Sequence, residues 1–153
     1  MSDDEVDESG TILLDPTRRG AVPRLVMIVE DSDLDATLLK RVLGRLRPEV
    51  EVVRTRDGLD ALELLESRRP DLIIMDIRMP RMSGREALVE IKMNAALKRI
   101  PVIMMSTSSD DVDIEYCYDN HANAYVAKSF SVKEGKAMEN LVKFWLGTAE
   151  LAA

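Results

Sequence analysis

The stretch 25-LVMIVED-31, together with the later stretch 72-LIIMD-76, decides the fold of this chain. Each begins as a short apolar run and ends on carboxylates, which is typical of a strand that is buried on both faces and has a polar carboxyl end. Further short apolar runs complete the set. The sequence therefore predicts five buried strands, at residues 25–30, 50–54, 71–76, 101–105 and 124–127.

A helical pattern fills each gap between the predicted strands. The first helix has Ser32 as its N-cap and Asp33 and Asp35 in its first turn, and its apolar residues recur at helical spacing until Pro48 ends it. Four further helices are predicted, beginning after Gly58, after Gly84, near Ser108 and near Val132, with the last ending by Gly147. Five successive β-α units predict an α/β fold, a doubly wound parallel sheet covered on both faces.

Five polar residues fall at the carboxyl ends of the predicted strands, namely Glu30, Asp31, Asp76, Ser106 and Lys128. In an open parallel sheet, ligands bind outside these carboxyl ends. Carboxylates that lie close together disfavour joint ionisation unless a cation neutralises them. The sequence therefore predicts a metal site at this edge of the sheet.

Length and composition restrict the class of protein. The chain of 153 residues is long enough for one domain of ordinary size. Cys117 is the only cysteine, which excludes an intramolecular disulfide and a cysteine-rich metal site. No apolar segment approaches the roughly 20 residues of a membrane span, and the N-terminus lacks the features of a signal peptide. We therefore expect a cytoplasmic protein with no membrane partner.

Most of the negative charge lies at the N-terminus. The formal net charge is −7, and residues 1–10 contain five acids and no base, which leaves −2 for the rest of the chain. Direct DNA binding is not expected, because phosphate contacts require a basic face. Residues 1–23 lack periodicity and contain several glycines and prolines, so we predict a flexible acidic tail followed by a domain at 24–153.

The strand-end residues resemble those of the receiver domains of two-component response regulators. Val29-Glu30-Asp31 looks like the family's acidic pair, and residues 74–80, Ile-Met-Asp-Ile-Arg-Met-Pro, look like its phosphoacceptor segment, with Gly84 following. The family's hydroxyl, aromatic and lysine positions correspond to Ser106, Tyr125 and Lys128, which lie 30, 49 and 52 positions after Asp76. The resemblance covers residues 24–147, and its strength comes from the joint spacing.

The resemblance implies a flavodoxin-like (βα)5 sheet with strand order 2-1-3-4-5, and an aspartyl phosphate formed on Asp76 with Mg²⁺. Asp31 and Asp76 would bind the metal directly, Glu30 through water, and Arg78 through its backbone carbonyl. Lys128 and Ser106 would contact the phosphoryl group. Such a chain is not an enzyme in the usual sense, since it only catalyses its own phosphorylation and slow dephosphorylation.

The resemblance also implies a switch and partners. Ser106 would move toward the phosphoryl group and Tyr125 would turn inward, which would change the surface of the fourth helix, fifth strand and fifth helix. A sensor histidine kinase would be the phosphodonor. The segment 113–125 and the ending Lys143-Phe-Trp-Leu look like the small regulators paired with phytochrome-type kinases. No output domain is expected, so the response would pass to an unknown downstream protein or phosphotransfer partner.

Two positions depart from the family pattern. Glu30 stands where aspartate is commoner, and Ser129 stands where proline, typically in a cis peptide, follows the lysine. A cis bond before a residue other than proline costs about 2.5 to 4 kcal/mol. Either the Lys128 to Ser129 bond is cis and strained, or the loop follows another path.

The last predicted helix carries an apolar face wider than one core contact needs. Phe144 and Trp145 contribute to this excess, which favours a homodimer surface, although both could instead cover the core of their own domain.

Two other function classes stay open. A haloacid dehalogenase-like phosphatase would need a second acid at position 78, where this chain has arginine. A receiver-fold binding module acting without phosphorylation would usually lack the aspartate, the acidic pair or the lysine.

Overall fold

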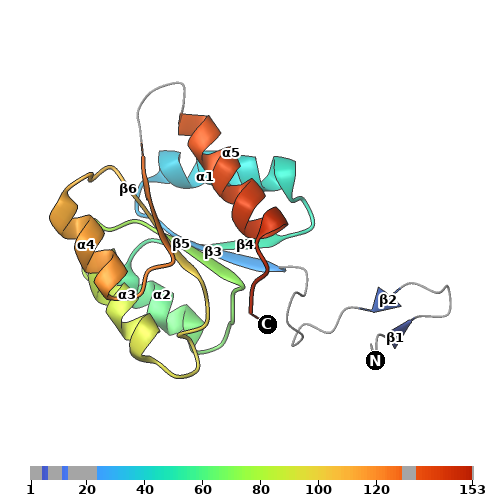
Figure 1. Cartoon of the computed structure of the whole chain (residues 1–153), viewed down its shortest axis with the longest axis horizontal. Helices are drawn as coiled ribbons and strands as arrows, with labels where there is room; N and C mark the ends of the chain where they lie inside the picture. The colour runs from blue at the N-terminus through green and yellow to red at the C-terminus, as the bar shows by residue number, and fades with distance from the viewer. Residues whose placement is uncertain (1–4, 7–11, 14–23, 129–133, 153) are drawn as a thin grey trace.

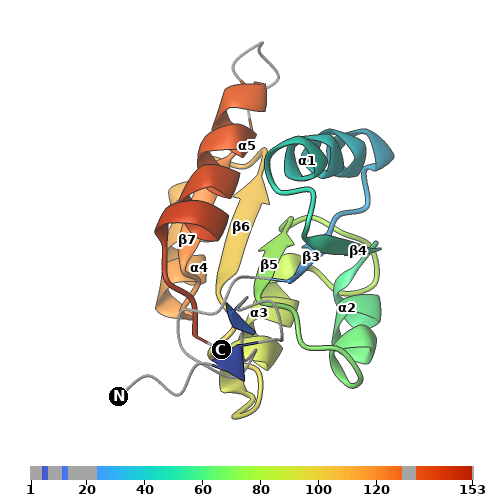
Figure 2. The ribbon, with the colours of Figure 1, turned by 90° about the vertical axis from the view of Figure 1, so that its right-hand side faces the viewer.

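The computed structural model describes residues 5–6, 12–13, 24–128 and 134–152. Its main sheet has five parallel strands, β3 (Leu25–Val29), β4 (Glu51–Thr55), β5 (Leu72–Met75), β6 (Val102–Ser106) and β7 (Ala124–Ala127). Their spatial order is β4-β3-β5-β6-β7, as Figure 2 shows. In sequence order within this sheet, the arrangement is 2-1-3-4-5, which confirms the predicted flavodoxin-like fold.

Five α-helices cover the two faces of this sheet. They are α1 (Asp33–Leu46), α2 (Gly58–Leu65), α3 (Gly84–Met93), α4 (Asp111–Asp119) and α5 (Glu134–Lys143), and α5 continues into the π-helical turn η1 (Phe144–Thr148). Helices α1 and α5 lie side by side on one face, whereas α2, α3 and α4 cover the other (Figure 1). The fold is therefore three-layered.

Alternate residues of the strands supply two separate apolar clusters. Met27 and Met104 belong to the cluster under α2, α3 and α4, whereas their neighbours Val26 and Ile103 belong to the cluster under α1 and α5. Successive side chains of a strand point to opposite faces. Because both faces are covered, the central strands are apolar throughout, and this explains why they appear in the sequence as continuous apolar runs.

Helix capping follows the sequence at α1 but not at α4. Ser32 is the N-cap of α1, and its hydroxyl accepts a hydrogen bond from the Asp35 amide at 3.2 Å, as predicted. Helix α4 was predicted to begin near Ser108, and its N-cap lies two residues later, at Asp110, which accepts from the Val112 amide at 2.9 Å. The Ser108 hydroxyl instead donates to Asp113.

Before the domain, strands β1 (Glu5–Val6) and β2 (Ile12–Leu13) form a short antiparallel pair. The flexibility predicted for residues 1–23 and the domain boundary at residue 24 stay predictions. Among the described helices, none combines the length and apolarity that crossing a bilayer would require.

Candidate functional site

Strand register brings the predicted acids together. Val29, the last residue of β3, pairs with Met75, the last residue of β5. Glu30 and Asp76, which follow them directly, therefore lie side by side. The Asp76 amide donates to the Val29 carbonyl at 2.9 Å, and the Glu30 amide donates to the Thr55 carbonyl of β4 at 3.0 Å. Hydrogen bonds to neighbouring strands therefore fix the backbone positions of both acidic residues.

Asp76 lies at the bottom of the site with 9% of its surface exposed. Its Oδ1 accepts a hydrogen bond from the Ile77 amide at 2.8 Å. Gly84 closes the loop behind it, since the Gly84 amide donates to the Ile77 carbonyl at 2.8 Å. A Cβ at position 84 would lie 1.9 Å from the Asp76 carbonyl oxygen, so glycine is needed for this close backbone approach.

Glu30, Asp31 and Asp76 fit a divalent cation. One carboxylate oxygen from each lies within 4.8 Å of the others. Asp31 is exposed to solvent, whereas the other two are buried, so the cluster is open on one side. An all-oxygen set with room for water is the chemistry that Mg²⁺ and Mn²⁺ prefer.

Lys128 joins this cluster from the end of β7. Its Nζ donates to Glu30 Oε2 at 2.6 Å and to Asp35 Oδ2 at 2.9 Å, and it lies 3.7 Å from Asp76 Oδ2. The lysine is 7% exposed. Sequence reasoning missed Asp35, although it lies four and seven positions before the buried residues Leu39 and Val42 and so shares their helix face.

Burial and neighbouring charge perturb both partners of the Lys128 to Glu30 ion pair. Burial raises the pKa of Glu30 to about 7, the hydrogen bond from Lys128 offsets only part of this, and the charge of Asp76 raises it further. Burial acts to lower the pKa of Lys128, but the hydrogen bonds to Glu30 and Asp35 and the charge of Asp76 outweigh it, so that pKa is raised. Lys128 therefore remains a cation inside the site.

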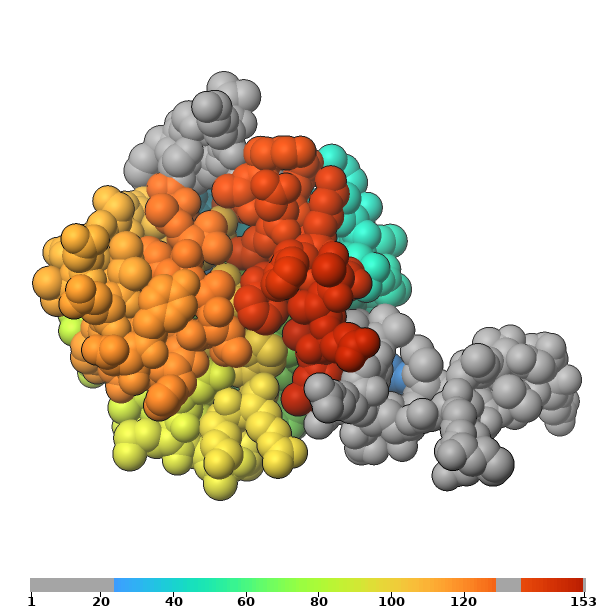
Figure 3. Space-filling model, in the orientation of Figure 1, coloured from blue at the N-terminus to red at the C-terminus, as the bar shows by residue number. Residues whose placement is uncertain are grey.

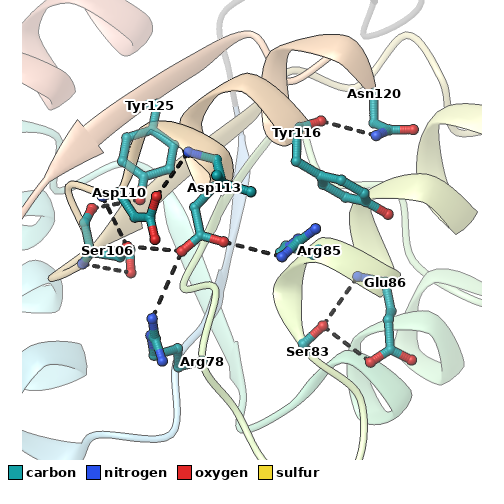
Figure 4. A network of polar contacts seen from close by, with 12 residues as sticks. Arg78, Ser83, Arg85, Glu86, Ser106, Asp110, Asp113, Tyr116, Asn120 and Tyr125 are labelled. Carbon is teal, nitrogen blue, oxygen red and sulfur yellow. Dashed lines mark hydrogen bonds and ion pairs between the residues drawn. The ribbon is translucent and has the colours of Figure 1, made fainter.

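Ser106 and Tyr125 both contact Ser108, which lies in the loop between β6 and α4; Figure 4 shows the two predicted switch residues near each other. Ser106 is fully buried, and its hydroxyl oxygen accepts a hydrogen bond from the Ser108 amide at 3.3 Å. The Tyr125 hydroxyl donates to the Ser108 carbonyl at 2.6 Å, and the ring packs against the core cluster under α2 to α4. Both predicted switch residues thus hold Ser108.

Asp113 of α4 also holds this loop, and Figure 4 shows it between Ser106 and Arg85. It accepts hydrogen bonds from the Ser108 hydroxyl at 2.8 Å and from Arg85 of α3 at 3.2 Å, and Arg78 lies 3.8 Å away. Arg85 also stacks over the Tyr116 ring at 3.9 Å. The sequence offered no sign of this network, because its members come from four segments.

A family model of the response regulator receiver domain matches residues 26–139, which cover the main sheet except Leu25, α1 to α4 and the first part of α5. The chain belongs to the response regulator receiver domain family. Receiver domains are the phosphoryl-accepting modules of two-component signalling, and the predicted class is thereby confirmed.

Relatives of this receiver domain match over most of their length. The response regulator Rcp1 of Synechocystis is 39% identical over 139 residues, which are 86% of this chain and 95% of Rcp1. The polar-differentiation response regulator DivK of Brucella anthropi is 37% identical over 128 residues, which are 84% of this chain and 100% of DivK.

Solved structures agree with this assignment. The phosphorylated cyanobacterial phytochrome response regulator RcpA superposes with a TM-score of 0.81 at 37% identity, covering 86% of this chain and 99% of RcpA. The Mn²⁺-bound form of Rcp1 also gives 0.81, at 39% identity, covering 86% of this chain and all of Rcp1. A divalent metal thus binds a close relative of this receiver domain.

The remaining predicted site residues lie outside the cluster of acids and Lys128. The Arg78 side chain points to Asp113, and metal binding by its backbone carbonyl stays a prediction. Trp145 packs against the core cluster under α1 and α5, whereas Phe144 is 51% exposed, and their rings make an edge contact at 5.3 Å. Ser129, and with it the geometry of its bond to Lys128, lies outside the described residues.

Proposed function

We propose that this receiver domain accepts a phosphoryl group from the histidine of a sensor kinase onto Asp76, with Mg²⁺ at Glu30, Asp31 and Asp76. The observation that carries the proposal is that one buried carboxylate, that of Asp76, belongs to the three-acid cluster and also lies 3.7 Å from the Lys128 ammonium. A nucleophile placed between two sources of positive charge suits phosphoryl transfer.

In the proposed reaction, an Asp76 carboxylate oxygen forms a bond to phosphorus while the bond between phosphorus and the kinase histidine nitrogen breaks. That nitrogen keeps the bonding electrons and takes up a proton. The bound metal would neutralise charge on the transferring group. Lys128 would neutralise part of the same charge from the opposite side, since its Nζ already faces Asp76 Oδ2.

Signalling is proposed to follow from Ser106. If its hydroxyl turned to hydrogen-bond the phosphoryl group, it would release the Ser108 amide, and the loop held by Tyr125 and Asp113 could rearrange. This loop leads into α4, which lies with β7 and α5 on one face of the molecule (Figure 3). The α4, β7 and α5 surface is therefore the proposed readout, equivalent to the predicted surface of the fourth helix, fifth strand and fifth helix.

The test is incubation with acetyl phosphate and Mg²⁺, followed by mass spectrometry of the intact protein. We expect one added phosphoryl group, lost in Asp76→Asn and strongly reduced by EDTA. An adduct of equal yield in Asp76→Asn would overturn the acceptor assignment, and an adduct insensitive to EDTA would overturn the metal assignment. No adduct in the wild type would favour a binding module that acts without phosphorylation.

A phytochrome-type histidine kinase is the proposed donor, because RcpA and Rcp1 are similar along nearly their whole length. Radiolabelled phosphoryl transfer from a purified kinase of this type should be faster than from a histidine kinase with an unrelated sensor. Equal rates from both kinases would contradict the pairing.

A homodimer is proposed through the exposed Phe144 ring. Trp145 packs on its own domain, so Phe144→Ala is the cleaner variant. Light scattering should show a dimer that shifts toward monomer in Phe144→Ala and not in Met93→Ala, which removes another exposed apolar side chain on α3. An unchanged mass in folded Phe144→Ala would contradict this surface.

A further inference from the structure

We infer that Arg54 of β4 is a positioning residue for the metal site, because it fixes the backbone that carries Asp31. The inference rests on the proposed metal site and extends it to a residue outside the acidic cluster. Arg54 lies on the edge strand and is separated from Glu30 by 24 positions. Its side chain is largely buried, with 15% of its surface exposed.

Arg54 holds the turn between β3 and α1 through three hydrogen bonds to two acceptor atoms. Nε and Nη2 donate to the Glu30 carbonyl oxygen at 3.0 and 2.8 Å, and Nη1 donates to Asp33 Oδ1 at 2.7 Å. The Glu30 carbonyl belongs to the peptide that joins Glu30 to Asp31. Two N–H groups of one planar guanidinium that converge on a single carbonyl oxygen hold that oxygen in place more firmly than one donor would.

Asp31 depends on this restraint more than the other two acids. Glu30 is held by the Ser32 amide and Lys128, and Asp76 by the Ile77 amide. Within the described part of the chain, no side chain or amide donates a hydrogen bond to the Asp31 carboxylate. Its direction is therefore set by its own backbone, and Arg54 fixes the peptide that precedes it.

The charge of Arg54 and its contacts act in opposite directions on metal binding. A cation near the acidic cluster repels a divalent metal, so removal of the charge alone would tighten binding. Loss of the two hydrogen bonds to the Glu30 carbonyl would loosen Asp31 and weaken binding. Removal of a partner that orients a metal ligand typically costs about 10- to 100-fold in affinity.

Arg56 provides a matched control. It carries the same charge, its Nη2 contacts Asp33 Oδ1 at 2.6 Å, and among its described contacts none reaches the Glu30 carbonyl. Arg56→Met therefore removes a nearby cation and one contact to Asp33, and it leaves both hydrogen bonds to the Glu30 carbonyl in place. Arg54→Lys is the second variant, since it keeps the charge and loses the two N–H groups that converge on the Glu30 carbonyl.

The experiment is a calorimetric titration of MnCl₂ into the full chain, with urea unfolding to show that each variant is folded. Arg54→Met should bind Mn²⁺ about 10-fold more weakly than wild type. Arg54→Lys keeps the repelling charge and loses the pair of donors, so it should bind Mn²⁺ at least as weakly as Arg54→Met. Arg56→Met should bind as tightly as wild type or more tightly. In a chain that already carries Asp31→Asn, Arg54→Met should weaken Mn²⁺ binding little further, because Arg54 acts through Asp31.

If folded Arg54→Met binds Mn²⁺ as tightly as Arg56→Met, which also lacks one nearby cation, the inference is overturned. If Arg54→Met does not fold, Arg54→Lys decides, and an unchanged Mn²⁺ affinity in that variant would overturn the inference. A wild-type chain that binds no Mn²⁺ would instead overturn the proposed metal site itself.

Discussion

Lys128 Nζ lies 2.6 Å from Glu30 Oε2, although the two residues are 98 positions apart in the chain, and both side chains are almost wholly buried. The same ammonium contacts Asp35 at 2.9 Å. One lysine at the end of β7 thus neutralises acids that belong to β3 and α1. The carboxyl ends of β7 and β3 are thereby joined across β5 and β6.

Lys128→Met should lower the stability of the metal-free protein. Removal of one partner of a buried ion pair leaves uncompensated charge, here on Glu30 and Asp35, at a cost of about 3 kcal/mol. Urea unfolding in EDTA measures this loss. The control is Lys40→Met, which removes an exposed lysine from α1 and should change stability by less than about 0.5 kcal/mol. Equal effects of the two variants would show that the ion pair is not stabilising.

Gly84→Ala should destabilise the domain by about 3 kcal/mol, the upper end of the cost of overpacking. The added methyl would meet the Asp76 carbonyl oxygen at 1.9 Å, and backbone atoms cannot move aside as a flexible side chain can. Gly44→Ala is the matched control, because a Cβ there meets nothing within 4 Å. Because position 44 is exposed on a helix, Gly44→Ala should raise the free energy of unfolding by about 0.5 to 1 kcal/mol. Chemical denaturation of both variants checks the opposite signs.

Cys117 should be unreactive in the folded protein. Burial raises the pKa of its thiol to about 11, with a smaller contribution from Asp113, so the thiolate is scarce at pH 8. A disulfide reagent such as DTNB should label the native chain slowly and the urea-unfolded chain quickly. Rapid labelling of the native chain at pH 8 would show that the α4 helix opens more readily than its packing indicates.

Asp57 should make stability depend on pH in the acid range. A hydrogen bond from Arg81 and then one from the Asp60 amide lower the pKa of Asp57 below its usual value. The carboxylate is thus favoured in the folded state. Its contribution is present above the unfolded pKa of about 3.9 and is lost as the pH falls through the lower folded pKa.

Asp57→Asn tests this effect, because asparagine still caps α2 but cannot titrate. Stability of the wild type and the variant should be compared by urea unfolding at pH 6 and pH 3. The difference between them should be smaller at pH 3. A constant difference would mean that Asp57 has the same pKa in the folded and unfolded chains.

Most of the fold was predictable because its signals are local. Short apolar runs bounded by turn residues favour strands buried on both faces. Ser32 caps the helix that follows it by contacts within three residues. The α4 boundary was not predictable in the same way. Ser108 is an equally good cap by composition, but its hydroxyl contacts Asp113 and its carbonyl contacts Tyr125 from another element.

For the candidate site too, the sequence predicted which residues lie near one another but not which side chains are in contact. The chain by itself determined that Glu30, Asp31, Asp76, Ser106 and Lys128 would gather at one edge, because residues at the carboxyl ends of parallel strands share that edge. Only the tertiary structure decided which side chains touch. The contacts of Lys128 with Asp35 and of Arg54 with the Glu30 carbonyl depend on how strands and helices pack in register, and no local pattern in the sequence records that packing.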